Sequence, residues 1–243
     1  MADVVKTGIS GLDAMLYGGI PDGNQTIVAG GPGAGKTLLS FEFLYRNAKM
    51  GIPGVFFALE ENPKRVIENA KKAFKDFTDI DDLIAKKLLL VDGEDPSARL
   101  HEGADPSSYE FGKVVSDIEA LVTSINAKRI VIDSISLLSI IISNPIAYRR
   151  AMLALVSNLR RIDVTSLLVS EISNPERSKL TFKPEFFIFD GIINMYQSGE
   201  VEKRITALEV IKMRGSNHSN ATAPYEITPS GFKVYASEEL ESE

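Results

Sequence analysis

Short, mainly apolar runs alternate along this chain with longer stretches in which apolar residues recur every three or four positions. Such runs are typical of parallel strands buried on both faces, and they cover residues 25–29, 54–59, 88–91, 129–134 and 167–171. The stretches between them predict helices at about 38–50, from 63 onward, at 110–126 and at 146–162. This βαβ alternation predicts an α/β fold, with a mostly parallel, doubly wound sheet flanked by helices.

The pattern changes in the last fifth of the chain. Short alternating runs follow one another without an intervening helix, at 192–196, 207–212, 225–228 and 232–235. They predict antiparallel hairpins that extend the sheet. Near the other end, glycines bracket a short helix expected at 10–16, and the aperiodic stretch 93–107 predicts a loop.

Nothing in the pattern divides the 243 residues into two units, since there is no internal repeat and no linker. We therefore expect one domain over residues 1–236. Residues 237–243 form an acidic tail that we expect to be disordered.

Composition narrows the classes of function. The net charge is −6 and there is no cysteine, which excludes disulfides and thiolate metal sites and disfavours a surface that attracts nucleic acid as a whole. The two histidines, His101 and His218, are too few for a histidine metal cluster. The amino end lacks a leader-like apolar core, and the apolar stretch 130–142 is too short to span a bilayer. These features predict a cytoplasmic protein without membrane insertion.

A glycine-rich loop follows the first long apolar run and precedes a helical stretch. Its residues are Gly30, Gly31, Pro32, Gly33, Ala34, Gly35, Lys36 and Thr37, and Leu38 begins the helical pattern. The spacing G-x-x-x-x-G-K-[ST] is that of a P-loop, in which backbone N–H groups wrap around a polyphosphate and the helix start adds positive potential. Lys36 would reach the β- and γ-phosphates, and the Thr37 hydroxyl would bind Mg²⁺. The loop predicts a nucleotide-binding protein.

Two acidic positions stand at the ends of predicted strands, where open α/β sheets place their ligands. Asp133 follows the run 130–132 and is expected to hold Mg²⁺ through its water shell. Glu60 and Glu61 end the run that begins at residue 54. We expect Glu60 to activate the attacking water with Glu61 as its neighbour, although the residues alone leave open which of the two acts directly.

Two groups of basic residues have two readings each. Lys212 and Arg214 would point the same way along a strand, as surface charges or as fixed cations aimed at a phosphate. Arg177, Lys179 and Lys183 lie in a predicted loop that could touch nucleic acid, but a solvated loop is the favoured reading. The histidines are interpreted as loop residues.

Six segments in order resemble the KaiC-like branch of the RecA/RadA ATPases. They are 7–13, 18–21, the P-loop, 56–61, 132–134 and 211–218, and together they span nearly the whole chain. The resemblance implies a RecA-like core that binds ATP with Mg²⁺, a choice of base that the spacing alone does not make. It further implies that Glu60 and Glu61 are the catalytic pair. In the hexameric rings typical of the family, Lys212 and Arg214 would reach the γ-phosphate bound by the neighbouring subunit.

One departure from the family bears on function. The family's clock autokinase carries a Ser-Thr pair shortly before an aspartate that resembles Asp190, and Phe186 and Phe187 stand at those positions here. Autophosphorylation of the clock type is therefore not expected.

We expect an ATPase that hydrolyses ATP between the subunits of a ring in a regulatory or signalling role, with a regulatory protein as a candidate partner. The alternatives are a nucleotide-dependent assembly switch with very slow turnover, or a recombinase-like DNA-binding ATPase. The recombinase reading is the least favoured, because the chain is acidic and carries no additional DNA-binding domain.

Overall fold

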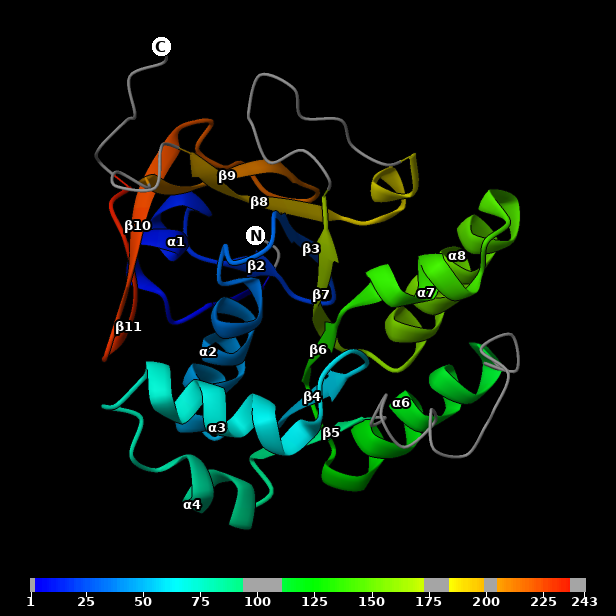
Figure 1. Ribbon diagram of the computed structural model, residues 1–243, viewed down its shortest axis with the longest axis horizontal. Coiled ribbons are helices and arrows are strands. Elements are labelled where there is room, and N and C mark those ends of the chain that lie inside the picture. Colours follow the sequence, from blue (N-terminus) through cyan, green and yellow to red (C-terminus); the bar gives the residue numbers. More distant parts are fainter. Residues whose placement is uncertain (1–2, 94–110, 173–183, 199–204, 237–243) are drawn as a thin grey trace.

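The computed structural model describes residues 3–93, 111–172, 184–198 and 205–236, and within them one nine-stranded sheet organises the fold (Figure 1). Side by side, its strands are β11 (Gly231–Val234), β10 (Thr222–Thr228), β9 (Ile205–Met213), β8 (Gly191–Ser198), β3 (Gln25–Gly30), β7 (Thr165–Glu171), β6 (Arg129–Asp133), β4 (Gly54–Ala58) and β5 (Leu89–Gly93). Two further strands of two residues each, β1 (Val4–Val5) and β2 (Ile20–Pro21), pair with each other outside this sheet.

The sheet has a parallel and an antiparallel part. Neighbours from β8 through β5 run parallel to one another, whereas β8, β9, β10 and β11 pair antiparallel in sequence order. The expected α/β class and the antiparallel extension at the carboxyl end are both confirmed. Four of the parallel strands, β3, β4, β6 and β7, are buried almost throughout, as their apolar sequences predicted, whereas the edge strand β5 is mostly half-buried.

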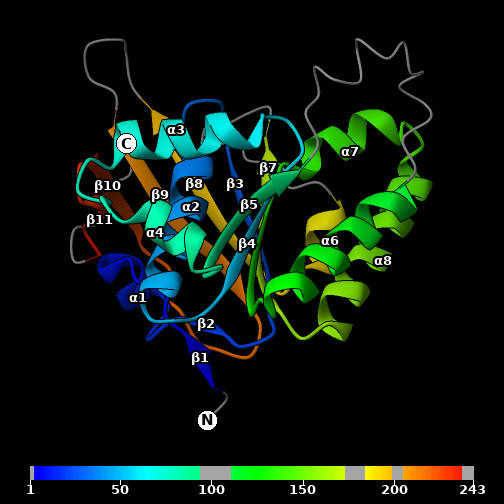
Figure 2. The same cartoon turned by 90° about the horizontal axis from the view of Figure 1, so that it is seen from below.

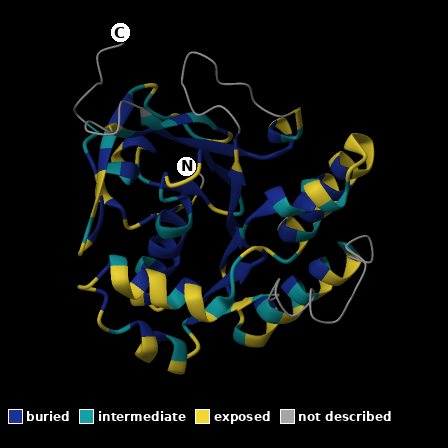
Figure 3. Cartoon of the chain, viewed as in Figure 1, coloured by how far each residue is buried: buried dark blue, intermediate teal, exposed yellow. Residues whose placement is uncertain are grey.

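Helices cover both faces of the sheet (Figure 2). One face packs against α1 (Ser10–Met15), α2 (Lys36–Lys49), α3 (Pro63–Ala73) and α4 (Ile80–Ala85). The other packs against α6 (Phe111–Ile125), α7 (Ile135–Ile141), α8 (Pro145–Arg161) and the 3₁₀ helix η3 (Pro184–Ile188). Two apolar layers therefore lie on either side of the buried sheet (Figure 3). No helix in the described ranges has the length and apolarity to cross a bilayer.

Two helices were missed by the sequence pattern. The short α4 carries only two buried residues, too few to display a helical period. The apolar stretch 130–142 is divided between β6 and α7, because Ser134 interrupts it as a helix N-cap whose hydroxyl accepts a hydrogen bond from the Ser136 N–H (3.2 Å). A strand and a helix thus divide one mainly apolar stretch, of which only the strand was predicted.

A buried carboxylate attaches the antiparallel extension to the helix that follows the P-loop. Glu42 on α2 is completely buried and accepts hydrogen bonds from the Phe232 N–H (2.6 Å) and from Arg46 (2.9 Å). Arg46 also donates to the carbonyl of Ser230 (2.6 Å). Burial raises the pKa of Glu42, and the hydrogen bonds from Phe232 and Arg46 oppose that rise.

Replacing Arg46 by alanine should leave Glu42 buried without its cation and lower the free energy of unfolding by about 2–3 kcal/mol near pH 7. Because the pKa of Glu42 is already raised, the variant's carboxyl protonates readily, and the loss should shrink as the pH is lowered toward 5. Urea denaturation at both pH values measures this.

Lys49→Ala is the matched control, because it removes a half-exposed ion pair with Asp79 from the same helix. It should cost about 1 kcal/mol or less. Equal losses for the two variants, or a loss for Arg46→Ala that ignores pH, would contradict the role given to Glu42.

Candidate functional site

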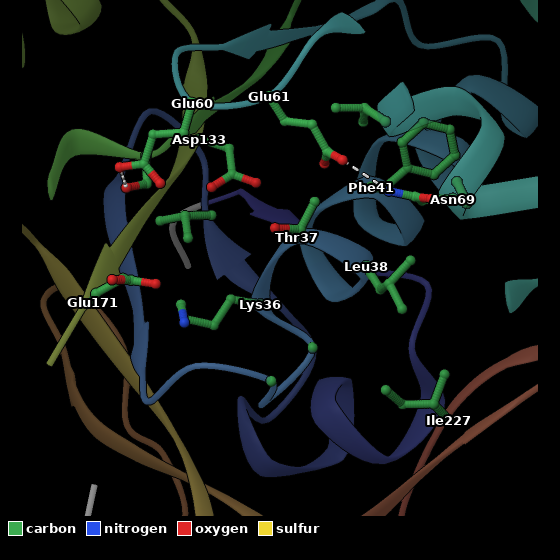
Figure 4. A pocket seen from close by; sticks show the side chains of 16 residues that line it. Lys36, Thr37, Leu38, Phe41, Glu60, Glu61, Asn69, Asp133, Glu171 and Ile227 are labelled. Carbon is green, nitrogen blue, oxygen red and sulfur yellow. Dashed lines mark hydrogen bonds between the residues drawn. The ribbon is translucent and has the colours of Figure 1, made fainter. Parts of the chain in front are cut away.

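A pocket of about 420 Å³ opens where the parallel strands reach their carboxyl ends (Figure 4). The P-loop and the start of α2 form its floor, and the ends of β4, β6 and β7 with one face of α3 form its walls. A neighbouring cavity of about 350 Å³ shares the residues Thr37, Glu60, Glu61 and Asp133. Parallel strands that end at one edge thus bring residues distant in sequence to one pocket.

The P-loop adopts a conformation that needs its glycines. Gly33 and Gly35 have φ angles of +78° and +83°, in the left-handed region that glycine adopts without strain, and Gly35 is the N-cap of α2. The Lys36 side chain folds back into this loop, where its ammonium donates to the carbonyl of Gly31 (2.9 Å). The loop is therefore wrapped around the space in which a phosphate would lie.

Lys36 is 7% exposed, so its charge depends on the carboxylates around it. Burial lowers the pKa of Lys36, while Glu171, Asp133 and Glu60 oppose that decrease, in this order of strength. Leu38, the last residue expected at the nucleotide, also lines the pocket, as does Ile227 from β10.

Asp133 at the end of β6 is the most perturbed acid of the site. Burial raises its pKa to about 6, and the negative charges of Glu60 and Glu61 add to the rise. A hydrogen bond from the Thr37 side chain and the charge of Lys36 oppose it. The sequence placed Thr37 and Asp133 together, and the structure does so.

The donor set around Asp133 fits Mg²⁺. Thr37 and Asp133 offer hard oxygen ligands, and the nearby glutamates supply excess negative charge that a divalent cation would neutralise. Within the described ranges, no group of three or more His, Cys, Asp or Glu residues could hold a metal by itself. A cation here would therefore need water and phosphate oxygens to complete its coordination, which is the usual arrangement for Mg²⁺.

The two adjacent glutamates have different partners. Glu60 accepts a hydrogen bond from the Ser134 hydroxyl (2.7 Å) and points toward Asp133 (Figure 4). Glu61 points toward α3, where it accepts a hydrogen bond from the Asn69 amide (2.9 Å) and lies 3.8 Å from the Arg65 guanidinium. Both glutamates line the pocket and act on the charge of Asp133, so the structure separates them by their hydrogen-bond partners, and which of the two acts on water stays a prediction.

Lys212 and Arg214 lie away from this pocket. Lys212 is in register with Ile192 near the amino end of β8, whereas the P-loop follows the carboxyl end of the neighbouring β3. The Lys212 ammonium donates to the carbonyl of Phe189 (2.6 Å) and the Arg214 guanidinium to that of Phe187 (3.1 Å). Both side chains reach the same segment, so the expectation that they point the same way holds, although β9 already ends at Met213.

An acidic residue anchors this basic pair. Asp190 lies 3.6 Å from the Arg214 guanidinium and accepts a hydrogen bond from Arg160 (2.7 Å). Burial lowers the pKa of Lys212, the charge of Arg214 lowers it further, and Asp190 opposes both. Lys212 and Arg214 lie toward the amino ends of β8 and β3, whereas the P-loop follows the carboxyl end of β3. Within one copy of the chain, these two cations therefore do not reach the P-loop.

Three polar residues of the pocket were not singled out from the sequence. Glu171 ends β7, and a charged residue after a buried strand is the same signal that identified Asp133, so it could have been found. Ser134 and Asn69 show their roles only through hydrogen bonds to the glutamates.

Of the remaining candidates, only His218 lies within the described residues. His218 is not part of its lining, and its ring Nδ1 is 3.0 Å from the Ser219 carbonyl. His101 and the loop residues Arg177, Lys179 and Lys183 lie outside the described residues.

Comparisons with known proteins agree on one family. A family profile described as "ATPase: KaiC" matches residues 5–239. A UPF0273 protein from Aeropyrum pernix is 34% identical over 97% of this chain and 94% of its own length. The circadian clock oscillator protein KaiC of a Picosynechococcus species is 30% identical over 95% of this chain, which spans only 44% of that relative. The crystal structure of a KaiC-like protein from Pyrococcus horikoshii superposes with a TM-score of 0.81, at 28% identity over 97% of this chain and all of its own.

The raised pKa of Asp133 predicts that its charge destabilises the chain without nucleotide and Mg²⁺. A carboxyl whose pKa is raised to about 6 by folding is protonated without cost at low pH, and its stability contribution is lost as the pH rises through that value. Asp133→Asn should therefore raise the free energy of unfolding near pH 7.5 by on the order of 2 kcal/mol, and the gain should disappear near pH 4. Urea denaturation measures both.

Asp163→Asn is the matched control, because it removes an exposed carboxylate just before the start of β7. It should change the free energy of unfolding little at either pH. An Asp133→Asn variant less stable than the parent chain near pH 7.5 would refute the interpretation.

Proposed function

The chain belongs to the KaiC family of ATPases, and we propose that it binds Mg²⁺-ATP in the pocket described above and hydrolyses it between the subunits of a ring, in a regulatory or signalling role. One observation carries the proposal. A P-loop lysine, a buried aspartate beside the P-loop threonine and an oriented glutamate line a single pocket. These are the parts that phosphoryl transfer to water requires.

Each residue has a task set by its surroundings. The backbone of the P-loop holds the phosphates, and Lys36 balances their charge. Thr37 and Asp133 would hold Mg²⁺, which would supply positive charge to neutralise the phosphate oxygens. Glu60 takes a proton from the attacking water, or orients that water, while the Ser134 hydroxyl fixes one carboxylate oxygen. Glu61, bonded to Asn69, supports its neighbour from the α3 side.

The positions of Lys212 and Arg214 support a role toward a neighbouring subunit. Along β8 and β3, Lys212 lies about three residues, or roughly 10 Å, short of the carboxyl edge that carries its own P-loop. A cation in that place serves a phosphate bound by another copy, in the manner of an arginine finger in trans. A hexameric ring supplies that arrangement at every interface.

A nucleotide-dependent assembly switch is the second candidate. In a single copy, Lys212 and Arg214 donate to backbone carbonyls of the chain itself rather than to a phosphate. Turnover in this candidate function depends on how well a neighbouring subunit is placed. Autophosphorylation of the clock type is not part of the proposal. Phe186 is buried and Phe187 exposed beside Asp190, and neither carries a hydroxyl.

Glu60→Gln should leave Mg²⁺-ATP binding within about threefold of the parent chain and lower turnover by about 100-fold or more, because the amide removes the proton acceptor but keeps the shape. Phosphate release and calorimetric binding in the same samples test this. Glu61→Gln is the matched control and should retain more turnover, whereas Lys36→Ala should abolish tight binding. Unchanged hydrolysis in Glu60→Gln would remove that residue from the mechanism.

The trans arrangement is tested by mixing two inactive variants. Lys36→Ala keeps the finger residues but lacks phosphate binding, and Arg214→Ala keeps the P-loop but lacks one cation. Light scattering should show assembly with Mg²⁺-ATP for Arg214→Ala, and turnover should fall at least about 100-fold. Mixed rings should recover part of the activity, since some interfaces then combine an intact P-loop with an intact finger. A monomer that hydrolyses ATP, or a mixture that stays inactive, would contradict a finger in trans.

A further inference from the structure

Glu171 is a fourth carboxylate of the pocket, and none of the tasks above uses it. It ends β7 opposite Gly30, the residue that begins the P-loop, and the next N–H along, that of Ile172, donates to the Gly30 carbonyl (3.3 Å). This pairing sets the Glu171 side chain at the rim of the P-loop. There its carboxylate points toward the Lys36 ammonium (Figure 4).

A chain of hydrogen bonds fixes the backbone of Glu171 relative to Glu60. The Glu171 N–H donates to the Ser136 hydroxyl (2.7 Å), and the Ser136 N–H donates to the Ser134 hydroxyl (3.2 Å). The Ser134 hydroxyl in turn donates to Glu60 (2.7 Å). The ends of β7 and β6 and the start of α7 are thus held in one arrangement, so the position of Glu171 at the pocket is built into the fold.

The carboxylate of Glu171 differs from the other three acids in its partners. Thr37 donates to Asp133, Ser134 to Glu60 and Asn69 to Glu61. Within the described residues, the Glu171 carboxylate has no hydrogen-bond donor and no ion pair, and Lys36 is the basic residue that faces it in this pocket. Its negative charge is therefore offset mainly by the cation that a bound phosphate also needs.

We propose that Glu171 competes with bound phosphates for Lys36, and thereby weakens nucleotide binding and speeds nucleotide release. The inference rests on the proposed function, because it assumes that phosphates occupy the P-loop. A carboxylate on the rim attracts Lys36 when the phosphates are absent, and it repels the phosphates when they bind. Both effects weaken nucleotide binding. Glu171 tunes how long product stays bound, whereas Glu60 acts on the attacking water.

The test is the affinity for Mg²⁺-ADP, which involves no turnover. Glu171→Gln removes the charge and keeps the shape, so it should bind Mg²⁺-ADP about tenfold more tightly, because a like charge at the rim of the phosphate site is removed. The gain should appear as slower release when bound fluorescent ADP is chased with excess ADP. Glu171→Asp keeps the charge and should bind within about threefold of the parent chain.

Asp163→Asn is the control for a general change in net charge. Asp163 lies just before the start of β7, so it is separated from Glu171 by about 20 Å of strand, well beyond the screening length. Its binding should equal that of the parent chain.

Two results would overturn the inference while the proposed function stands. Equal or weaker ADP binding by Glu171→Gln would show that the carboxylate does not compete for Lys36, and a fall in turnover at unchanged affinity would instead make Glu171 part of the chemical step. A parent chain that binds no Mg²⁺-ADP would overturn the proposed function itself, and this inference with it.

Discussion

The site depends on keeping one lysine charged in a buried place. Lys36 has almost no contact with water, and its ammonium would lose its proton more readily there without the carboxylates that surround it. Those carboxylates come from the ends of three different strands, which meet only because the strands are parallel and end at one edge. The doubly wound sheet therefore brings together the carboxylates that keep the P-loop lysine charged.

The clustering of acidic residues in this pocket disfavours the charged form of Asp133, and it also favours the binding of a cation. Asp133 is held with a pKa near 6 because it is buried beside two glutamates, which disfavours its charged form until a cation arrives. A magnesium ion and a triphosphate together would relieve this imbalance, since the cation balances the acids and Lys36 balances the phosphates. The excess negative charge in the pocket thus favours binding of the Mg²⁺-ATP complex that we propose.

The P-loop and the Lys212–Arg214 pair lie toward opposite ends of the strands. The P-loop lies at the carboxyl ends of the parallel strands, whereas Lys212 and Arg214 lie toward the amino ends of β3 and β8, beside η3. The antiparallel extension carries these cations and is attached to α2 through buried Glu42. The fold therefore offers a phosphate site on one side and a pair of cations on another, which suits an assembly in which each copy completes its neighbour's site.

The sequence by itself determined the parallel core, the P-loop and the acids at strand ends, because burial on both faces and phosphate wrapping each require residue types at fixed spacing. It predicted the strand at 129–134, which corresponds to β6, but it did not predict α7, since a short apolar run serves a strand or a helix equally well until Ser134 caps the helix. Only the tertiary structure distinguished the partners of Glu60 from those of Glu61, and only it placed Glu171 near Lys36 with no hydrogen-bond donor to its carboxylate among the described residues. Hydrogen-bond partners such as Ser134 and Asn69 come from separate elements, and their meeting is set by how strands and helices pack, which no local pattern encodes.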